Sequence, residues 1–338
     1  MVIIGKGQHQ YKANLHSHTT ISDGKLTPEA MARAYRKRGY SILAITDHEA
    51  PVAHPELNRE DFLMITGYEA YIRPDPECRY DPLHPEIHIN LLAKQADCVT
   101  YVGYDPKFCK YLPHETAEKR PKCGPEGPRL YTGEYIQNFI DCARAAGYLV
   151  AMNHPVWSME SEDTLLRLDG LYSLEIYNTG SYTINGSECN NGLYDAFLMN
   201  GKMLYCHGAD DNHNKKPFED LLSDSFGSWT MVMAEELTYP AVMDALEKGN
   251  FYASTGPEIR CLTAEHGHVH VEMRGVQRAI LVRSMKLCQN VYRPDGGEIT
   301  EADFDLPEDT GYAYLILRDR YGKEAHTRAF TRKELGLE

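Results

Sequence analysis

The sequence has 338 residues, a hydrophobic fraction of 42% and a formal net charge of −14. This acidity argues against a broad polyanion-binding surface, but it is compatible with a small phosphorylated substrate beside bound metal ions. No apolar run approaches the roughly 20 residues that span a bilayer, and the apolar run at the start is too short for a secretory signal, so we expect a cytoplasmic protein with no membrane partner.

The first strand carries a metal-ligand pattern. His16 and His18 lie two residues apart in the segment YKANLHSHTTISD, and Asp23 follows in a Ser-Asp-Gly turn. Alternate side chains of an extended strand point the same way, so both imidazoles project from one face. Taken alone, the pattern is equally compatible with polar residues on an exposed strand, because short motifs match by chance.

A helix and a buried strand come next. Thr27 suits the N-cap of this helix, Pro28 its first position and Gly39 the residue after its end. The segment SILAITDH then forms a near-continuous apolar run that ends in Asp47-His48. Such a run predicts a parallel strand that is buried on both faces.

The same unit recurs further along the chain. We predict strands at 62–69, 86–93, 148–154, 172–178 and 202–209, with helices at 134–147, 188–200 and 240–250. Alternating helices and strands imply a parallel sheet, either closed or doubly wound, and a count of about seven strands favours a barrel. Polar residues at the carboxyl ends of such strands mark the active site.

Residues 97–134 interrupt this rhythm. The stretch is rich in Pro, Gly, Tyr and Lys and shows no clear periodicity. A loop of this length is functional or disordered. One reading is a lid that brings Lys107, Lys110, Arg120 or Lys122 to a substrate, and the alternative is a solvated insertion.

From about residue 259 the pattern changes to short alternating strands, including HVHVEMRG, RAILVRSM, YAYLILRDRYG and EAHTRAF. This predicts a small all-β, sandwich-like domain. His266, His268 and His270 alternate there. We interpret them as one face of an edge strand rather than a second metal site, because we see no carboxylate-rich segment to accompany them.

The strand-end residues together form one candidate metal site. They are His16, His18, Asp23, His48, Glu69, His88, His154, Asp211 and His213, and they include six of the fifteen histidines. Mixed imidazole and carboxylate ligands suit Zn²⁺, Mn²⁺ or Fe²⁺ rather than Ca²⁺ or Mg²⁺. The set exceeds what one ion needs, so we expect two or three divalent ions with one carboxylate bridging.

The ordered motifs LHSHTTISDGKLTPEA, ITDHE, GYEA, EIHINLL, NHP and GADDNH resemble those of the PHP (polymerase and histidinol phosphatase) family of metal-dependent phosphoesterases, over nearly all of residues 10–257. The resemblance implies a distorted (β/α)7 barrel over residues 1–258, with a trinuclear cleft, followed by the β domain at 259–338. It implies one ion on His16, His18 and the late aspartate, a second on Glu69, His88 and His154, and a third on Asp23, His48 and His213.

Some residues keep an alternative. The family's Asp-x-His ending selects Asp211, with Asp210 as the other choice. Some members carry histidine where Asp23 stands. The β tail, with LRDRYGKEAHTRAF, resembles a branch of the family that includes a carbamate hydrolase, and Glu175 and Asn178 in LEIYN recur in that branch. We expect these two side chains behind the metal ligands or on the substrate.

The predicted reaction is attack by a metal-activated hydroxide. We place Glu69, His48 and Asp47 at the chemistry, with Asp47 or His207 orienting a ligand or moving a proton. The neighbouring Cys206 is interpreted as structural, since the nine cysteines contain no Cys-x-x-Cys pair and read as reduced thiols.

We therefore predict a phosphoesterase that acts on a small phosphorylated metabolite, a nucleotide or an oligonucleotide end, with no polymerase attached. One alternative is a hydrolase of a non-phosphate ester, carbamate or amide with the same metal site. A phosphatase should bring one or two Arg or Lys side chains to the cleft, which separates these two functions. The other alternative is a metal-binding protein without catalysis.

Overall fold

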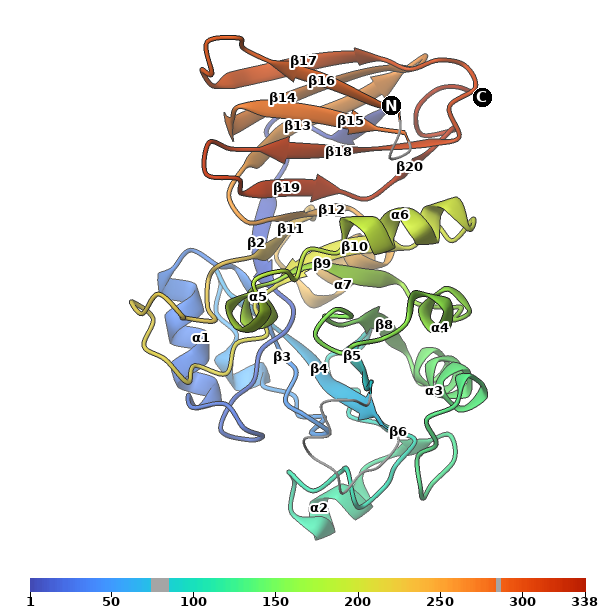
Figure 1. The fold of residues 1–338 in the computed structure, drawn as a ribbon. Helices are drawn as coiled ribbons and strands as arrows, with labels where there is room; N and C mark the ends of the chain where they lie inside the picture. Colours follow the sequence, from blue (N-terminus) through green and yellow to red (C-terminus); the bar gives the residue numbers. More distant parts are fainter. Residues whose placement is uncertain (74–84, 284–286) are drawn as a thin grey trace.

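The computed structural model describes residues 1–73, 85–283 and 287–338 of the chain. An α/β region lies below an all-β region in Figure 1, and both chain ends lie in the upper, β region. In the described residues, no helix is both long and apolar enough to cross a membrane.

Seven neighbouring strands build the sheet of the α/β region. In spatial order they are β10 (Tyr205–Ala209), β9 (Ser173–Asn178), β8 (Tyr148–Met152), β5 (Ile87–Ala93), β4 (Leu63–Ile72), β3 (Ile42–Ile45) and β2 (Gln10–Asn14). Neighbours pair in parallel except β5, which is antiparallel to both β4 and β8. The prediction of an all-parallel sheet is therefore wrong at β5, and the fold is mixed α/β.

Helices cover this sheet. They are α1 (Pro28–Lys37), α3 (Gly133–Ala145), α4 (Glu162–Leu166), α5 (Thr179–Asn185), α6 (Asn191–Met199) and α7 (Tyr239–Glu247). The predicted capping of α1 is confirmed: the Thr27 side chain accepts from the N–H of Ala30, and Gly39 has a φ of +79°. The buried face of α1, with Met31 and Tyr35, packs in a core with Leu43 of β3.

The closed barrel is not confirmed. The next strand after β10 in the chain, β11 (Trp229–Met233), pairs antiparallel with β2 at the other end of the seven-stranded path. It meets β10 through a side chain: the Thr230 hydroxyl accepts from the N–H of Gly208 at 3.2 Å and donates to the carbonyl of Gly208 at 2.8 Å. Among the described residues, no ladder joins β10 to β11.

The sheet continues beyond β11 into the β region. The further strands are β12 (Phe251–Ser254), β19 (Glu324–Thr327), β18 (Tyr312–Arg318), β15 (Arg278–Val282) and β16 (Cys288–Tyr292), while β20 (Phe330–Thr331) pairs with β18. The last two residues of the strand predicted at 278–285 lie outside the described residues. One sheet thus runs through both regions.

A second sheet covers this extension. Its strands are β1 (Val2–Ile4), β13 (Glu258–Glu265), β14 (His268–Val276) and β17 (Ile299–Asp305), in that order. Leu262, Val271 and Phe304 from this sheet meet Leu315 from β18 in a separate apolar core. Because β14 lies between β13 and β17, the interpretation of His268 and His270 as part of an edge strand is wrong. The domain boundary at residue 258 stays a prediction.

The 97–134 insertion has little regular structure. It contains the two-residue pair β6 (Tyr101–Val102) and β7 (Lys122–Cys123) and the short helix α2 (His114–Lys119). A short 3-10 helix, η1 (Pro55–Leu57), precedes β4. The insertion packs at the lower edge of the α/β region in Figure 1, near the ends of β4 and β5.

Candidate metal centre

All the residues predicted to bind metal converge at one edge of the α/β sheet. They form four overlapping groups of ligand atoms: His18, Asp23, His48 and His213; His16, His18 and Glu69; His16, His154 and Asp211; and His48, Glu69 and His88. Within each group the atoms lie within 4.8 Å of one another. The groups share members, so the arrangement is one continuous cluster.

The antiparallel direction of β5 explains how His88 reaches this edge. The other ligands lie in the last part of β4 or after the ends of their strands, but His88 is the second residue of its strand. Its register partner is Tyr71, near the end of β4, two residues beyond Glu69. A strand that runs backwards presents its first residues where its neighbours present their last.

Glu69 stands at the centre of the cluster. Its Oε1 lies 3.0 Å from Nδ1 of His88 and 3.2 Å from Nε2 of His154. Its Oε2 lies 2.9 Å from Nδ1 of His48 and 3.4 Å from Nε2 of His18. A carboxylate whose two oxygens face different histidines has the geometry of a bridging ligand.

Asp211, rather than Asp210, faces the histidines. Its Oδ1 lies 3.2 Å from Nε2 of His16 and 3.1 Å from Nε2 of His18. The oxygens of Asp210 instead accept hydrogen bonds from the hydroxyls of Tyr35 and Thr179 and from the N–H groups of residues 226–228. Asp210 therefore holds the loop that precedes β11, and Asp211 is the member of the pair that remains for a metal.

The group around Asp23 is more open. Oδ1 of Asp23 lies 3.3 Å from Nε2 of His213, 3.9 Å from Nε2 of His48 and 4.0 Å from Nδ1 of His18. The Asp23 side chain is 40% exposed, whereas the Glu69 side chain is 1% exposed. A third ion at this end would therefore be the most accessible to solvent.

Several ligand atoms are buried without a hydrogen-bond partner among the described residues. They include Nδ1 of His18, Oε2 of Glu69 and Oδ1 of Asp211. Buried polar atoms are normally paired, because an unpaired one costs about 1–3 kcal/mol. Orphaned imidazole and carboxylate atoms that point at one another fit divalent transition metal ions, which such mixed donor sets bind.

The charges within the cluster are strongly coupled. Burial alone would raise the pKa of Glu69, but His88, His16 and His48 hold the pKa of Glu69 well below its usual value. Burial would lower the pKa values of His18 and His88, yet the neighbouring carboxylates raise the pKa of His18 to about 9 and that of His88 to about 10. The carboxylates and the imidazoles of His18 and His88 thus stabilise one another's charged forms.

Glu175 supports the ligands from behind. Its Oε1 lies 2.7 Å from Nδ1 of His16, and its Oε2 accepts from the N–H of His154 at 2.9 Å and from the Asn178 amide at 2.8 Å. A carboxylate on the far nitrogen fixes the ring and makes the imidazole a better ligand. Nε2 of His207 lies 3.9 Å from the same carboxylate, and its Nδ1 bonds Ser173. Cys206 is fully buried.

Asp47 holds a loop. Its oxygens accept from the N–H and hydroxyl of Thr19 and from the N–H and hydroxyl of Ser22, at 2.5 to 3.1 Å. It belongs to none of the ligand groups found in the described chain. These contacts give Asp47 a positioning role for the segment between His18 and Asp23. Its predicted part in the chemistry therefore runs through that loop.

Two hollows open onto the cluster. One, of about 380 Å³, is lined by Asp23, His48, Glu69, His88, His154, Trp157, Gly180, Ser181, Thr183, Ile184, Asp211, His213, Lys215, Lys216, Leu222 and Asp224. The other, of about 400 Å³, is lined by Asp23, Lys25, His48, Tyr71, Arg73, Glu86, His88, Tyr111, Trp157 and Lys215. Among the described residues, the cations that line these hollows are Lys25, Arg73, Lys215 and Lys216.

The candidate cations of the insertion do not line these hollows. Lys107, Lys110, Arg120 and Lys122 line neither hollow in the described structure. A signal for two of the real ones was present, because Lys25 follows Asp23 by two positions and Lys215 follows His213 by two. Residues that flank a metal ligand on a loop share its side of the fold.

The insertion is fastened behind the cluster by a buried ion pair that the sequence analysis missed. Nη2 of Arg129 lies 2.9 Å from Oε2 of Glu49, and both side chains are fully buried. Arg129 also donates to the carbonyls of Gly103 and Tyr71. Glu49 directly follows His48, so this pair connects the insertion to a candidate ligand. Tyr111 of the insertion also stacks on His48, with ring centres 6.2 Å apart.

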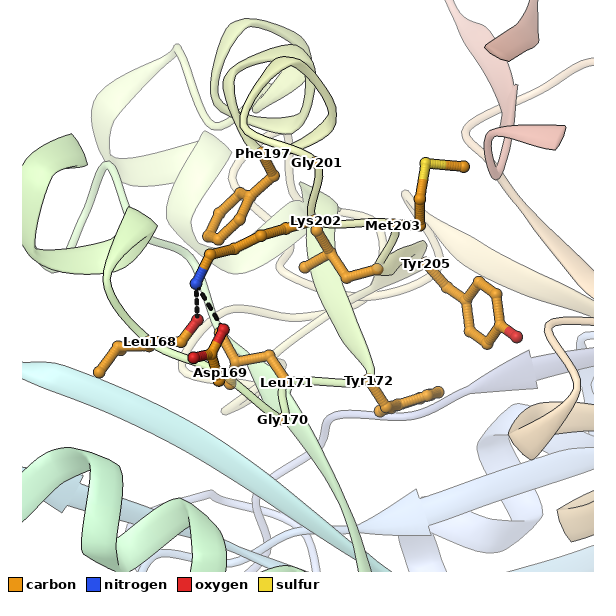
Figure 2. Close-up of a pocket in the computed structure, with 11 residues that line it drawn as sticks. Leu168, Asp169, Gly170, Leu171, Tyr172, Phe197, Gly201, Lys202, Met203 and Tyr205 are labelled. Atoms are coloured by element: carbon orange, nitrogen blue, oxygen red, sulfur yellow. Dashed lines mark hydrogen bonds and ion pairs between the residues drawn. The ribbon is translucent and has the colours of Figure 1, made fainter. Parts of the chain in front are cut away.

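A third hollow, of about 390 Å³, lies where β9 and β10 begin (Figure 2). Its one ammonium group, on Lys202, donates to the carbonyl of Leu168 at 2.8 Å and lies 2.7 Å from Oδ1 of Asp169. The cluster follows the ends of these strands, so this hollow lies away from it. With its charge already paired, it adds nothing to the site.

Parts of this chain are similar to known proteins. The PHP domain family matches residues 14–115. The 5'-3' exoribonuclease Rnm of Salmonella typhimurium is 38% identical over 76 residues, which are 22% of this chain and 25% of that protein. Rnm of Escherichia coli is 32% identical over 109 residues, which are 32% of this chain and 34% of that protein. The DNA polymerase/3'-5' exonuclease PolX of Bacillus subtilis is 37% identical over 90 residues, which are 21% of this chain and 16% of that protein. The alignments thus span about a third or less of these relatives.

The solved structures that the chain matches include a two-domain protein from Bacteroides vulgatus that contains a predicted PHP-like metal-dependent phosphoesterase. It is 12% identical, with 97% of each chain covered and a TM-score of 0.44. A putative metal-dependent phosphoesterase from Bifidobacterium adolescentis is 18% identical, with 63% of this chain and 92% of that one covered and a TM-score of 0.40.

Proposed function

We propose that this chain, whose residues 14–115 match the PHP domain family, hydrolyses a phosphate ester of a small metabolite, a nucleotide or an oligonucleotide end. The observation that carries the proposal is the cluster of nine imidazole and carboxylate side chains around Glu69, with ligand atoms that lack any other partner. Cations beside the cluster, which the phosphate reading requires, support it over a non-phosphate ester.

Three sets of side chains would each hold one metal ion. His16, His18 and Asp211 would hold one ion, Glu69 with His88 and His154 a second, and Asp23 with His48 and His213 a third. Divalent ions in such a donor set supply hydroxide at neutral pH and offset negative charge on a phosphate. We infer Zn²⁺, Mn²⁺ or Fe²⁺ from the mixed nitrogen and oxygen ligands.

The other residues of the chain orient and bind. Glu175 keeps His16 in one ring orientation through its 2.7 Å contact with Nδ1. Asp47 fixes the loop that presents Asp23. Lys25 and Lys215 place positive charge at the cleft, where the phosphate oxygens would lie. The Trp157 ring lies 5.3 Å from the ring of His88 and 5.0 Å from that of His154, and it shields these two imidazoles from water.

The named activities of the relatives favour a nucleic-acid end as one member of the substrate range. Rnm is named as a 5'-3' exoribonuclease and PolX as a DNA polymerase/3'-5' exonuclease. The net charge of −14 disfavours extended contact with a long polyanion. A nucleotide or a short end therefore fits better than a long duplex.

A metal-restoration assay tests the proposal. Protein stripped with a chelator is reloaded with Mn²⁺, Zn²⁺ or Fe²⁺ and given p-nitrophenyl phosphate and bis(p-nitrophenyl) phosphate. We expect turnover that returns with metal and is lost in Asp211→Asn. The matched control, Asp303→Asn in the β region, retains it.

Other outcomes contradict the proposal. Metal-dependent cleavage of p-nitrophenyl acetate or of an aryl carbamate, with no phosphate ester cleaved, would show the alternative hydrolase. Bound metal with no hydrolysis of any of these esters would show a metal-binding protein without catalysis.

A further inference from the structure

The cluster lies at the junction of two hollows rather than at the bottom of one. Both hollows are lined by Asp23, His48, His88, Trp157 and Lys215. Their volumes, about 380 and 400 Å³, are nearly equal. Each falls in the range of pockets that hold small organic ligands. A phosphorus atom at the cluster would therefore have room for a substituent on each side.

The two hollows differ in chemistry. The first continues from Trp157 to Ile184 and Leu222, which are 36%, 75% and 53% exposed. Large apolar side chains that remain exposed at the rim of a polar site mark a binding surface. The second hollow shares Trp157 but is otherwise lined by polar side chains such as Lys25, Arg73 and Glu86, with Arg73 3.8 Å from Glu86. One hollow thus suits an apolar or planar group and the other a polar group.

We propose that the substrate is an organic phosphodiester whose two substituents occupy the two hollows, with its phosphorus at the cluster. This inference rests on the proposed function and narrows it. The apolar or planar substituent lies against Trp157, Ile184 and Leu222. The second substituent lies beside Lys25. A monoester has a single substituent and leaves one hollow unused.

The reaction then has a defined balance. The oxygen of hydroxide forms a new bond to phosphorus, and the bond from phosphorus to one ester oxygen breaks. The leaving oxygen keeps the bonding electron pair and takes up a proton. The products are a phosphomonoester and an alcohol, with no oxidant or further reactant required.

Two chromogenic esters test this in the metal-loaded protein. We expect kcat/KM for bis(p-nitrophenyl) phosphate to exceed that for p-nitrophenyl phosphate by at least about 10-fold, because the monoester leaves the second hollow empty and the contacts of one substituent are worth an effect of that order. The double variant Ile184→Ser, Leu222→Ser should lower kcat/KM for the diester by about 10-fold, because one aryl group loses its apolar wall. The shift should come mainly through KM.

The chain offers a matched control. Tyr182 and Leu221 are exposed neighbours of the two substituted residues, at 56% and 94%, and line neither hollow. Tyr182→Ser, Leu221→Ser should leave kcat/KM for the diester unchanged. An equal fall of this kcat/KM in both double variants would overturn the assignment of the apolar hollow.

Failure of the inference is distinguishable from failure of the proposed function. Turnover of the monoester with a higher kcat/KM than the diester would overturn the diester inference and leave the phosphoesterase proposal standing. A metal-loaded protein that cleaves neither ester would overturn both.

Discussion

The molecule contains two His-x-His strands that face carboxylates, one in each region. His16 and His18 are fully buried and share Glu69 and Asp211. His268 and His270, on β14, have 51% and 30% exposed side chains. The antiparallel register puts them opposite Asp305 and Asp303 of β17, partners that the sequence analysis did not find.

The difference shows what turns a His-x-His pattern into a candidate metal site. In the β region each imidazole has its own aspartate: Nδ1 of His268 lies 2.8 Å from Asp305 and Nδ1 of His270 lies 2.7 Å from Asp303. None of the ligand groups in the described chain includes them. In the α/β region one carboxylate serves several histidines, and ligand atoms stay orphaned. Burial and shared partners therefore matter more than the motif.

The largest effect should come from the shared carboxylate. Glu69→Gln keeps the shape of the side chain but removes the charge between the histidines. We expect kcat/KM for the better phosphate ester to fall by more than about 100-fold, since even an outer partner of a metal ligand changes affinity or activity by 10–100-fold. Steady-state kinetics at saturating Mn²⁺ measures this. Retention of more than a tenth of wild-type kcat/KM would contradict a central role for Glu69.

A smaller effect is expected for Glu175, which contacts the candidate ligand His16. Glu175→Gln leaves all nine candidate ligands in place and weakens the contacts of this carboxylate with Nδ1 of His16, the N–H of His154 and the Asn178 amide. We predict a 10–100-fold weaker metal affinity, measured by competition with a chromogenic chelator. The fold should persist, which circular dichroism checks. An unchanged dissociation constant in a folded variant would show that Glu175 serves only the core.

Metal binding should also release protons from His18 and His88. The carboxylates raise the pKa of His18 to about 9 and that of His88 to about 10, so both rings are protonated in metal-free protein at pH 7. A metal requires neutral imidazoles, so binding at pH 7 expels protons and tightens as the pH rises toward those values. Calorimetry in two buffers of different ionisation enthalpy counts the protons. A proton count of zero would contradict the charge arrangement.

The same pKa shifts set the stability of the metal-free protein. The stabilisation that His18 gains from its carboxylate partners is fully present below its unfolded pKa of about 6.5. It is lost as the pH rises through the folded value of about 9. Metal-free protein should therefore lose thermal stability between pH 7 and 9 more steeply than metal-loaded protein. Melting curves at both pH values with and without metal measure the difference.

The smallest effect is expected in the β region. Hydrogen bonding to Asp305 raises the pKa of the exposed His268, so the pair's contribution is present at low pH and is lost as the pH rises through the folded pKa. His268→Gln should change the free energy of unfolding by about 0–1 kcal/mol, as for other exposed ion pairs. Phosphate-ester turnover should stay within about 2-fold of wild type. A larger loss of turnover would connect this face to catalysis.

The cluster could be predicted from the sequence because apolar runs show where the strands end. The run before Asp47-His48 and the turn that carries Asp23 place those residues without knowledge of the fold. It could not reach the direction of β5, because an antiparallel neighbour and a parallel one share the same apolar pattern when both faces are buried. His88 was found by its residue type, not by its place.

Contacts between residues that lie far apart in the sequence could not be predicted either. Nothing local to Arg129 connects it with Glu49, 80 positions earlier, and the two meet only when the insertion folds against β4. The cross-strand partners of His268 and His270 depend on a strand register that cannot be predicted from the segment EADFD. The apolar wall made by Trp157, Ile184 and Leu222 comes from three separate loops and helices.

The central claim is that the buried His-x-His pair, and not the exposed one, belongs to a metal centre. The most direct measurement is the metal content of purified protein by mass spectrometry, for wild type and two matched double variants. We predict two to three ions per chain in wild type and in His268→Ala, His270→Ala, and a loss of at least one ion in His16→Ala, His18→Ala. Equal metal content in all three proteins, or loss only in the β-region variant, would contradict the account.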